Sequence, residues 1–406
     1  MAYSITDVFY IVALIILLGF LGEQFFRRTK IPSFLFLILA GFVLGPVLGI
    51  INKVALTPFL AIIAEFTLLM VLFHGGMDLK VTSILKDGWR PVVQVLLYIG
   101  VSVGLISLFS HIVLGFSIPV ALIFASIIGG ETTTVIIIPL SRSLNLREKT
   151  IMFLTFEAAL NSIILVVLFL TFVGLYQSGT ASPYNLTESL VSQFSIGILV
   201  GLALSLIWIY ILNYFKKGKY TYVLTLGFLL LTYSITNSVS GSGFLAVIIF
   251  GVVFGNHRFI SNLMRRKINM NNLTRQIFTF HGEITFLMET LFFIFLGLVL
   301  SISLSSLYAG LGVGLALVLI LMLSRYLAVN VSTLKSDIAK DKKIIFASMA
   351  QGLTPATLAI LSINYGIQHA NLFLTYVTYV IIITNIVTMV GTFIITRKAN
   401  AAHPKK

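Results

Sequence analysis

The sequence has 406 residues and no cysteine, and only 10% of its residues are charged. The lack of cysteine excludes disulfides and thiolate metal sites, so nothing in the sequence indicates redox chemistry. The scarcity of charge, with 58% hydrophobic residues and a mean hydropathy of +1.06, lies far outside the range of soluble proteins. The composition therefore predicts an all-α polytopic membrane protein.

A cleavable signal sequence is also lacking, because the first apolar run continues directly into Arg27-Arg28-Thr29-Lys30 without a small-residue cleavage pattern. Apolar segments long enough to cross roughly 30 Å of hydrocarbon as helices recur along the whole chain. The thirteen segments cover about residues 6–24, 32–50, 55–77, 91–112, 117–140, 151–175, 193–214, 221–237, 241–256, 282–302, 306–330, 343–364 and 371–396. We expect a single transmembrane domain over residues 1–400, a short cytoplasmic tail at 401–406 with no room for a nucleotide-binding domain, and no cofactor.

The net charge of +14 follows the membrane topology and does not indicate nucleic-acid binding. Every second loop is rich in Lys and Arg, whereas the intervening loops contain only Lys53 and the spans contain only Arg325. The positive-inside rule places the basic loops in the cytoplasm, the N-terminus outside and the C-terminus inside. The sequence therefore predicts a multi-pass protein of the cell membrane.

Two apolar segments, one in each half of the chain, repeat one pattern at the same spacing. Residues 116–140 contain Phe124-Ala125-Ser126 followed by Gly130 and Thr132, and residues 343–364 contain Phe346-Ala347-Ser348 followed by Gly352 and Thr354. The predicted topology makes the two segments antiparallel. The pattern therefore indicates an inverted repeat, which is typical of secondary transporters.

Both segments carry residues that interrupt helices: Gly129 and Gly130 in the first, and Gly352 and Pro355 in the second. Unwound backbone at membrane depth is tolerated where it lines a wet cavity, and its carbonyls can coordinate a cation there. The alternative interpretation is a pair of kinked helices packed through small residues. Glu131 directly follows the first pair of glycines, and an ionisable residue at this depth is a candidate functional site.

Other ionisable residues also lie inside predicted spans. Arg325 is the only basic residue deep in a span, so we expect it to form an ion pair with a glutamate, for which Glu157 is a candidate. Glu157 and Asn161 stand four residues apart and share a helix face, with Ser162 beside them, so this face offers oxygen atoms to a cation.

Four further residues are candidates for the ion pathway or for its regulation. Glu65 and Glu289 belong to spans outside the repeat, where either a structural partner or a place along the ion path would explain a buried carboxylate. His74 and Asp78 lie near the cytoplasmic end of the third span, where a helix-end polar cluster and a pH-sensing histidine are both compatible with the sequence.

Five strings in this order along nearly the whole chain resemble the monovalent cation:proton antiporters, also called sodium/hydrogen exchangers. They are Arg28-Thr29-Lys30-Ile31-Pro32 with Leu39-Ala40-Gly41-Phe42-Val43-Leu44-Gly45-Pro46, Leu72-Phe73-His74-Gly75-Gly76-Met77-Asp78-Leu79, Glu157-Ala158-Ala159-Leu160-Asn161-Ser162, Ser324-Arg325-Tyr326-Leu327-Ala328-Val329, and Gly352-Leu353-Thr354-Pro355-Ala356-Thr357-Leu358-Ala359.

The resemblance implies a core of helices around two broken, crossing helices, an elevator-like movement, and a homodimer. The core would comprise about residues 91–175 and 306–396, and the interface helices about residues 6–77 and 193–302. The resemblance also implies that Glu157 pairs with Arg325.

The chain departs from the family pattern at several positions. The family usually has an aspartate where this chain has Glu131 and a second aspartate at Ser162, so the carboxylate most central to transport in the family is absent. A hydroxyl that is common in the family is missing at Ala158, and an arginine is replaced by Gln351. These changes bear on stoichiometry and ion preference.

A buried carboxylate that binds either a proton or a cation couples the two fluxes by competition. With Glu157 neutralised by Arg325, we predict that Glu131 exchanges the two ions and that Thr132, Asn161 and Ser162 supply neutral oxygens. The predicted function is antiport of protons against sodium or potassium, with the lower charge of the site favouring the more easily dehydrated potassium.

Two alternatives remain open at this stage, a sodium-coupled symporter of an organic anion and a non-transporting homologue. A membrane enzyme is not indicated, since the sequence has no cysteine and no His-Glu-x-x-His motif.

Overall fold

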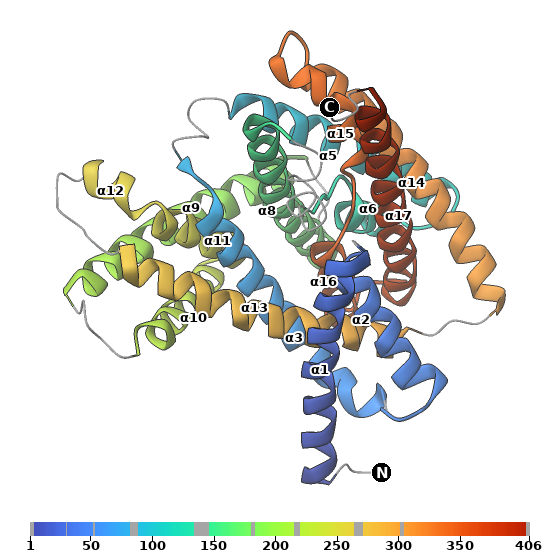
Figure 1. Ribbon diagram of the computed structural model, residues 1–406, viewed down its shortest axis with the longest axis horizontal. Coiled ribbons are helices and arrows are strands. Elements are labelled where there is room, and N and C mark those ends of the chain that lie inside the picture. Colours follow the sequence, from blue (N-terminus) through green and yellow to red (C-terminus); the bar gives the residue numbers. More distant parts are fainter. Residues whose placement is uncertain are drawn as a thin grey trace.

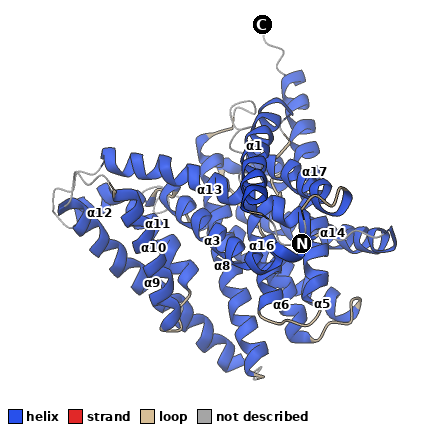
Figure 2. Cartoon of the chain, turned by 90° about the horizontal axis from the view of Figure 1, so that it is seen from below, coloured by secondary structure: helices blue, strands red, loops and turns tan. Residues whose placement is uncertain are grey.

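The computed structural model describes residues 4–29, 31–51, 53–81, 88–133, 146–179, 183–214, 220–263, 271–300 and 304–402. All regular structure in these ranges is helical, as Figure 2 shows. Each of the thirteen predicted spans contains a helix in its described part. The all-α prediction is confirmed.

Within the described part of the chain, eight helices are long and apolar enough to cross a membrane. They are α1 (Ile5–Thr29), α3 (Lys53–Asp78), α5 (Trp89–Ile112), α8 (Glu148–Ser178), α9 (Pro183–Tyr214), α13 (Asn271–Val299), α14 (Leu304–Ser332) and α17 (Ala370–Ala402).

The shorter helices complete the set of predicted spans. They are α2 (Ser33–Phe42), which continues as a π-helical turn at Val43–Val47, α6 (Ile118–Ile128), α10 (Thr221–Ser238), α11 (Gly243–Gly255) and α16 (Leu353–Asn364). Two short described elements join spans, α12 (His257–Leu263) and a 3-10 turn at Asp337–Asp341, and α15 (Lys342–Ala347) begins the predicted span 343–364.

Two predicted boundaries are wrong by about three helical turns. Helix α13 starts at Asn271, whereas the predicted span starts at residue 282, and α9 starts at Pro183 instead of residue 193. The extra turns carry polar residues such as Arg275 and Gln276, which a hydropathy criterion excludes although they continue the same helix.

The predicted interruptions are present in both crossing segments. Helix α6 ends at Ile128, and the chain from Gly129 to Thr133 is not helical. In the second segment, the chain between Ala347 and Leu353 is not helical and separates α15 from α16. The remainder of the first crossing segment, residues 134–140, lies outside the described residues.

The helices pack in two groups with the broken segments between them (Figure 1). Helices α5, α6, α8, α14 and α17 contact one another, and α16 packs on α17 and α6. The second group joins α1, α2 and α13 to α3, α9, α10 and α11. Figures 1 and 2 agree that α9 to α12 lie on one side and α5, α6, α14 and α17 on the other.

The two groups meet where α16 packs on α3 and where α8 packs on α9 and α11. Within the second group, α2 and α13 approach closely: a Cβ at Gly297 would collide with the carbonyl oxygen of Ile38. Close approach through small residues is typical of helix pairs in membranes, where burial from water does not drive association. The interrupted segments therefore belong to the first group and face the second.

Candidate ion-binding site

The two interrupted segments are joined directly by hydrogen bonds. The backbone N–H of Thr133 donates to the carbonyl oxygen of Ala350 at 2.7 Å. The Gln351 Nε2 atom donates to the carbonyl oxygen of Ile128, the last residue of α6, at 2.6 Å. Gln351 thus satisfies a carbonyl at the end of α6 without bringing a charge to the site.

The first interruption depends on glycine. Gly130 has φ +91°, a region that residues with a side chain rarely adopt, and a Cβ there would lie 3.2 Å from the backbone N and Cα of Ile99. The turn lets the chain leave α6 and present the next residue, Glu131, toward the second broken segment.

Glu131 is buried, with 3% of its surface exposed. Its Oε2 atom accepts a hydrogen bond of 3.1 Å from the backbone N–H of Gly352, which immediately precedes α16. The positive end of the α16 dipole therefore faces a carboxylate. Glu131 forms no ion pair with any residue that the structure describes.

A cavity of about 360 Å³ lies between the two helix groups and reaches Glu131. One wall comes from the broken segments and α8, including Glu131, Thr132, Ser162 and Thr354. The opposite wall comes from α2, α3 and α13. The lining mixes apolar side chains with hydroxyls and carboxylates, so water and a small cation can be solvated there.

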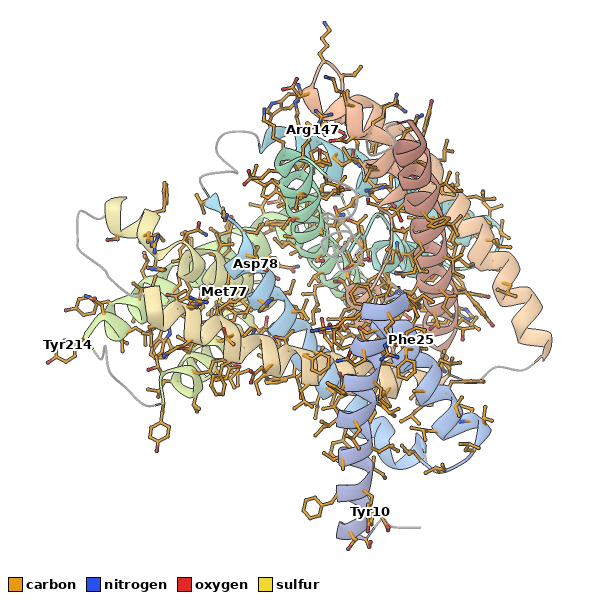
Figure 3. The ribbon with its side chains drawn as sticks, viewed as in Figure 1. Tyr10, Phe25, Met77, Asp78, Arg147 and Tyr214 are labelled. Atoms are coloured by element: carbon orange, nitrogen blue, oxygen red, sulfur yellow. The ribbon has the colours of Figure 1, made fainter. Side chains whose placement is uncertain are left out.

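The cavity continues toward the surface. It shares Asp78 and Thr155 with a second cavity of about 410 Å³, which is lined by charged residues such as Lys80, Arg90 and Glu148. Figure 3 shows Arg147, just before α8, at the opposite end of the view from Tyr10 of α1, and Asp78 between the two. The two cavities therefore adjoin at Asp78 and Thr155.

The predicted neutral ligands occupy different positions. Thr132 and Ser162 line the cavity, and Ser162 Oγ accepts a hydrogen bond of 3.2 Å from Thr354 Oγ1. Asn161 is fully buried behind the lining, where its Nδ2 donates to Thr132 Oγ1 at 2.9 Å. Asn161 therefore orients the Thr132 hydroxyl and does not face the cavity itself. Ala158 lines the cavity and adds no hydroxyl.

Glu157 and Arg325 form a fully buried ion pair, with an Nη1–Oε1 distance of 2.7 Å and an Nη2–Oε2 distance of 3.4 Å. Gln94 adds a hydrogen bond to Glu157 Oε1 at 3.3 Å. The Arg325 guanidinium also donates to the carbonyl oxygen of Ile345 on α15 at 2.7 Å. The pair thus links α8 and α14 to the second broken segment. Its two charges are compensated by each other and by groups that do not line the cavity.

The pathway candidates separate into two sets. His74, Asp78 and Glu289 line the same cavity as Glu131, and the His74 ring stacks on Phe278 of α13 with centroids 4.5 Å apart. Glu65 does not line this cavity. Its carboxylate accepts a hydrogen bond from Tyr233 of α10, which ties α3 to α10.

Several cavity residues could not be identified from the sequence. Thr133 and Thr155 lie in the cavity wall that contains Glu131, and Thr285 and Thr290 lie in the opposite wall, on α13. Hydroxyl residues are common in membrane helices, where they bond to their own backbone, so only the packed structure distinguishes these four.

Two interrupted helices that meet at a buried carboxylate, reached by a cavity between two helix groups, are an arrangement typical of secondary transporters. A family model described as "Sodium/hydrogen exchanger, transmembrane" matches residues 11–398. The chain belongs to the sodium/hydrogen exchanger family.

Comparison with individual proteins agrees with this assignment. The chain is 29% identical over 280 residues to the Na⁺/H⁺ antiporter ApNhaP of Aphanothece halophytica, a match that covers 68% of this chain and 50% of that protein. It is 25% identical over 412 residues to the K⁺/H⁺ antiporter NhaP2 of Shewanella oneidensis, covering 100% of this chain and 69% of that protein. The matched part thus spans only half the length of the Aphanothece protein.

The fold is similar to that of the sodium proton antiporter MjNhaP1 from Methanocaldococcus jannaschii. The TM-score is 0.78 at 22% identity, and the match covers 98% of this chain and 97% of that chain. The predicted antiporter fold is therefore confirmed.

Proposed function

We propose that the chain exchanges protons for a monovalent cation, sodium or potassium, by alternating access. The observation that carries this proposal is the position of Glu131, a buried carboxylate without an ion-pair partner among the described residues, at the meeting point of two broken helices and at the end of a cavity. Antiporters of both cations among the relatives support the same reaction class.

Coupling follows from competition at one carboxylate. When Glu131 is ionised, it binds a cation together with the hydroxyls of Thr132 and Ser162, and oxygen ligands suit a hard monovalent ion. When Glu131 takes up a proton, it loses the charge that holds the cation. A carrier that changes its orientation only in these two loaded states moves the ions in opposite directions.

The positive-inside rule orients the protein in the cell membrane with the N-terminus outside and the C-terminus in the cytoplasm. In that orientation, Asp78 and the charged residues of the adjoining cavity would face the cytoplasm, which supports the assignment of an inward-open state. The group of α5, α6, α8 and α14 to α17 would then move as a core against the other helices. Those other helices would form the contacts of a homodimer.

The cavity also favours antiport over symport of an organic anion. The described residues that line it include three acidic side chains, Asp78, Glu131 and Glu289, and no lysine or arginine. A site for an organic anion requires positive groups or several backbone N–H donors. Here one such donor, from Gly352, is already engaged by Glu131.

The test is proton flux in proteoliposomes that contain only this protein, driven by sodium or potassium jumps and read by an internal pH dye. We expect a cation jump to move protons in the opposite direction without any organic substrate. The half-saturating concentrations decide between the two cations. Flux that requires an added organic anion, or no flux with either cation, would contradict the proposal.

A further inference from the structure

One face of α13 forms much of the cavity wall opposite Glu131. The residues of α13 that line the cavity recur at helical spacing: Gly282, Thr285, Phe286, Glu289, Thr290 and Phe293. Three of these six have oxygen atoms in their side chains, and two of the three, Thr285 and Glu289, stand one helical turn apart. A cation on this wall would therefore find a carboxylate next to a hydroxyl.

Glu289 differs from Glu65, Glu131 and Glu157 because its carboxylate has no hydrogen bond or ion pair with any described residue. Glu157 is neutralised by Arg325, and Glu65 is bonded by Tyr233. Beside Glu289, the buried Thr290 side chain packs against α1, where a Cβ at Gly19 would lie 2.8 Å from Thr290 Oγ1, so this hydroxyl is not counted as a ligand. A half-buried carboxylate at membrane depth without a protein partner needs a proton or a cation.

The depth of Glu289 follows from contacts between α3 and α13. The position of Gly282 on α13 faces the His74 ring, since a Cβ there would lie 3.5 Å from His74 Cε1. Glu289 is seven residues further along α13, which is about 10 Å deeper. The Thr67 hydroxyl, also deeper on α3 than His74, lies 3.3 Å from the carbonyl oxygen of Met288. An ion that enters past Asp78 and His74 therefore reaches the level of Glu289 at the inner part of the cavity.

We propose that Glu289, with the hydroxyl oxygen of Thr285, forms a second monovalent-cation site on the wall opposite Glu131. A cation that enters past Asp78 occupies this site before Glu131 takes it over. This inference deepens the proposed antiport and rests on it for the role of the site. The existence of the site can be tested by binding alone.

The two carboxylates belong to different helix groups, which gives the second site a distinct role. Glu131 lies on the broken segment that packs with α8 and α17, whereas Glu289 lies on α13, which packs with α2 and α3. A movement of one group against the other separates the two sites. Glu289 then raises the local cation concentration on the cytoplasmic side only, and it does not travel with the bound ion.

The direct test counts Tl⁺ ions bound to the detergent-solubilised full chain by equilibrium dialysis. We expect Glu131→Gln to keep one Tl⁺ site per chain and the double variant Glu131→Gln with Glu289→Gln to keep none. Glu283→Gln, which removes an exposed carboxylate six residues earlier on α13, is the matched control in the Glu131→Gln background. Loss of all Tl⁺ binding in Glu131→Gln alone, or equal binding in the single and double variants, would overturn the proposal.

A transport measurement tests the role of the site. We expect Glu289→Gln to raise the half-saturating cation concentration about tenfold with most of the maximal rate retained, and Glu289→Asp to lie between this variant and wild type. Unchanged half-saturation in a folded Glu289→Gln protein would overturn the role of the site. If the wild-type chain exchanges ions but Glu131→Gln binds no Tl⁺, only the second site fails. If the wild-type chain exchanges no ions, the antiport proposal fails, and the Tl⁺ count still decides whether the site exists.

Discussion

At the scale of single residues, the chain separates its charges into those that hold the fold and those that face the cavity. Arg325, Glu157 and Gln94 satisfy one another away from the cavity. Glu131 and Glu289 face the cavity without an ion pair among the described residues. Arg325 therefore does not neutralise Glu131 or Glu289.

The Glu157–Arg325 pair leads to a prediction on stability. Glu157→Gln leaves Arg325 buried without its counter-charge, which typically costs about 3–5 kcal/mol. We expect a clearly lower unfolding temperature in detergent, measured by tryptophan fluorescence. The double variant Glu157→Gln with Arg325→Gln removes both charges and should recover part of this loss. A double variant whose loss equals the sum of the two single losses would contradict a coupled pair.

The pair could be predicted from sequence because Arg325 is the only basic residue deep in a span. The roles of Asn161 and Thr132 could not be separated in the same way. Both are small polar residues near the break, and only packing shows that Asn161 lies behind Thr132 and bonds to it. Glu289 was a candidate without a role, since the sequence does not reveal which spans face the same cavity.

At the scale of elements, the two interruptions determine the site. Glycine at 129, 130 and 352 predicts both breaks, because an unwound stretch in a membrane helix needs residues without helix preference and a polar environment. The hydrogen bonds that close the crossing, from Thr133 to Ala350 and from Gly352 to Glu131, could not be predicted. These hydrogen bonds depend on how the ends of α6 and α16 are positioned relative to each other.

Gly130 provides the element-scale prediction. Gly130→Ala places a side chain in a left-handed conformation, which costs about 1–2 kcal/mol, and presses its Cβ onto the backbone of Ile99. We expect loss of most ion exchange in proteoliposomes together with a lower unfolding temperature.

Gly104→Ala on the neighbouring helix α5 is the control, since a Cβ there meets no atom within 4 Å. Equal activities of the two alanine variants would show that the turn at Gly130 is not needed for the site.

At the scale of the whole molecule, each of the thirteen predicted spans contains a helix in its described part, and the fold is similar to that of the sodium proton antiporter MjNhaP1. The division into two packed groups could not be read from hydropathy. Lipid-facing and core-facing helices have similar composition, and contacts such as α16 on α3 join residues that are far apart in sequence.

Because the sequence has no cysteine, the orientation of the chain in the membrane can be tested with introduced cysteines, without labelling of native ones. Lys340 is exposed just before α15, and Gln368 is exposed just after α16, at the other end of the second broken segment. In intact cells, we expect a membrane-impermeant maleimide to label Gln368→Cys but not Lys340→Cys, and to label both after the cells are opened. Labelling of Lys340→Cys alone in intact cells would reverse the proposed topology.

The most direct test of the central claim is proton release when a cation binds. Sodium or potassium is added to the detergent-solubilised protein in weakly buffered solution, and the released protons are counted with a pH dye. Competition at Glu131 predicts proton release from wild type and from Glu283→Gln, and much weaker or no release from folded Glu131→Gln. Release of the same number of protons from Glu131→Gln as from wild type would contradict the account and move the exchange to another carboxylate.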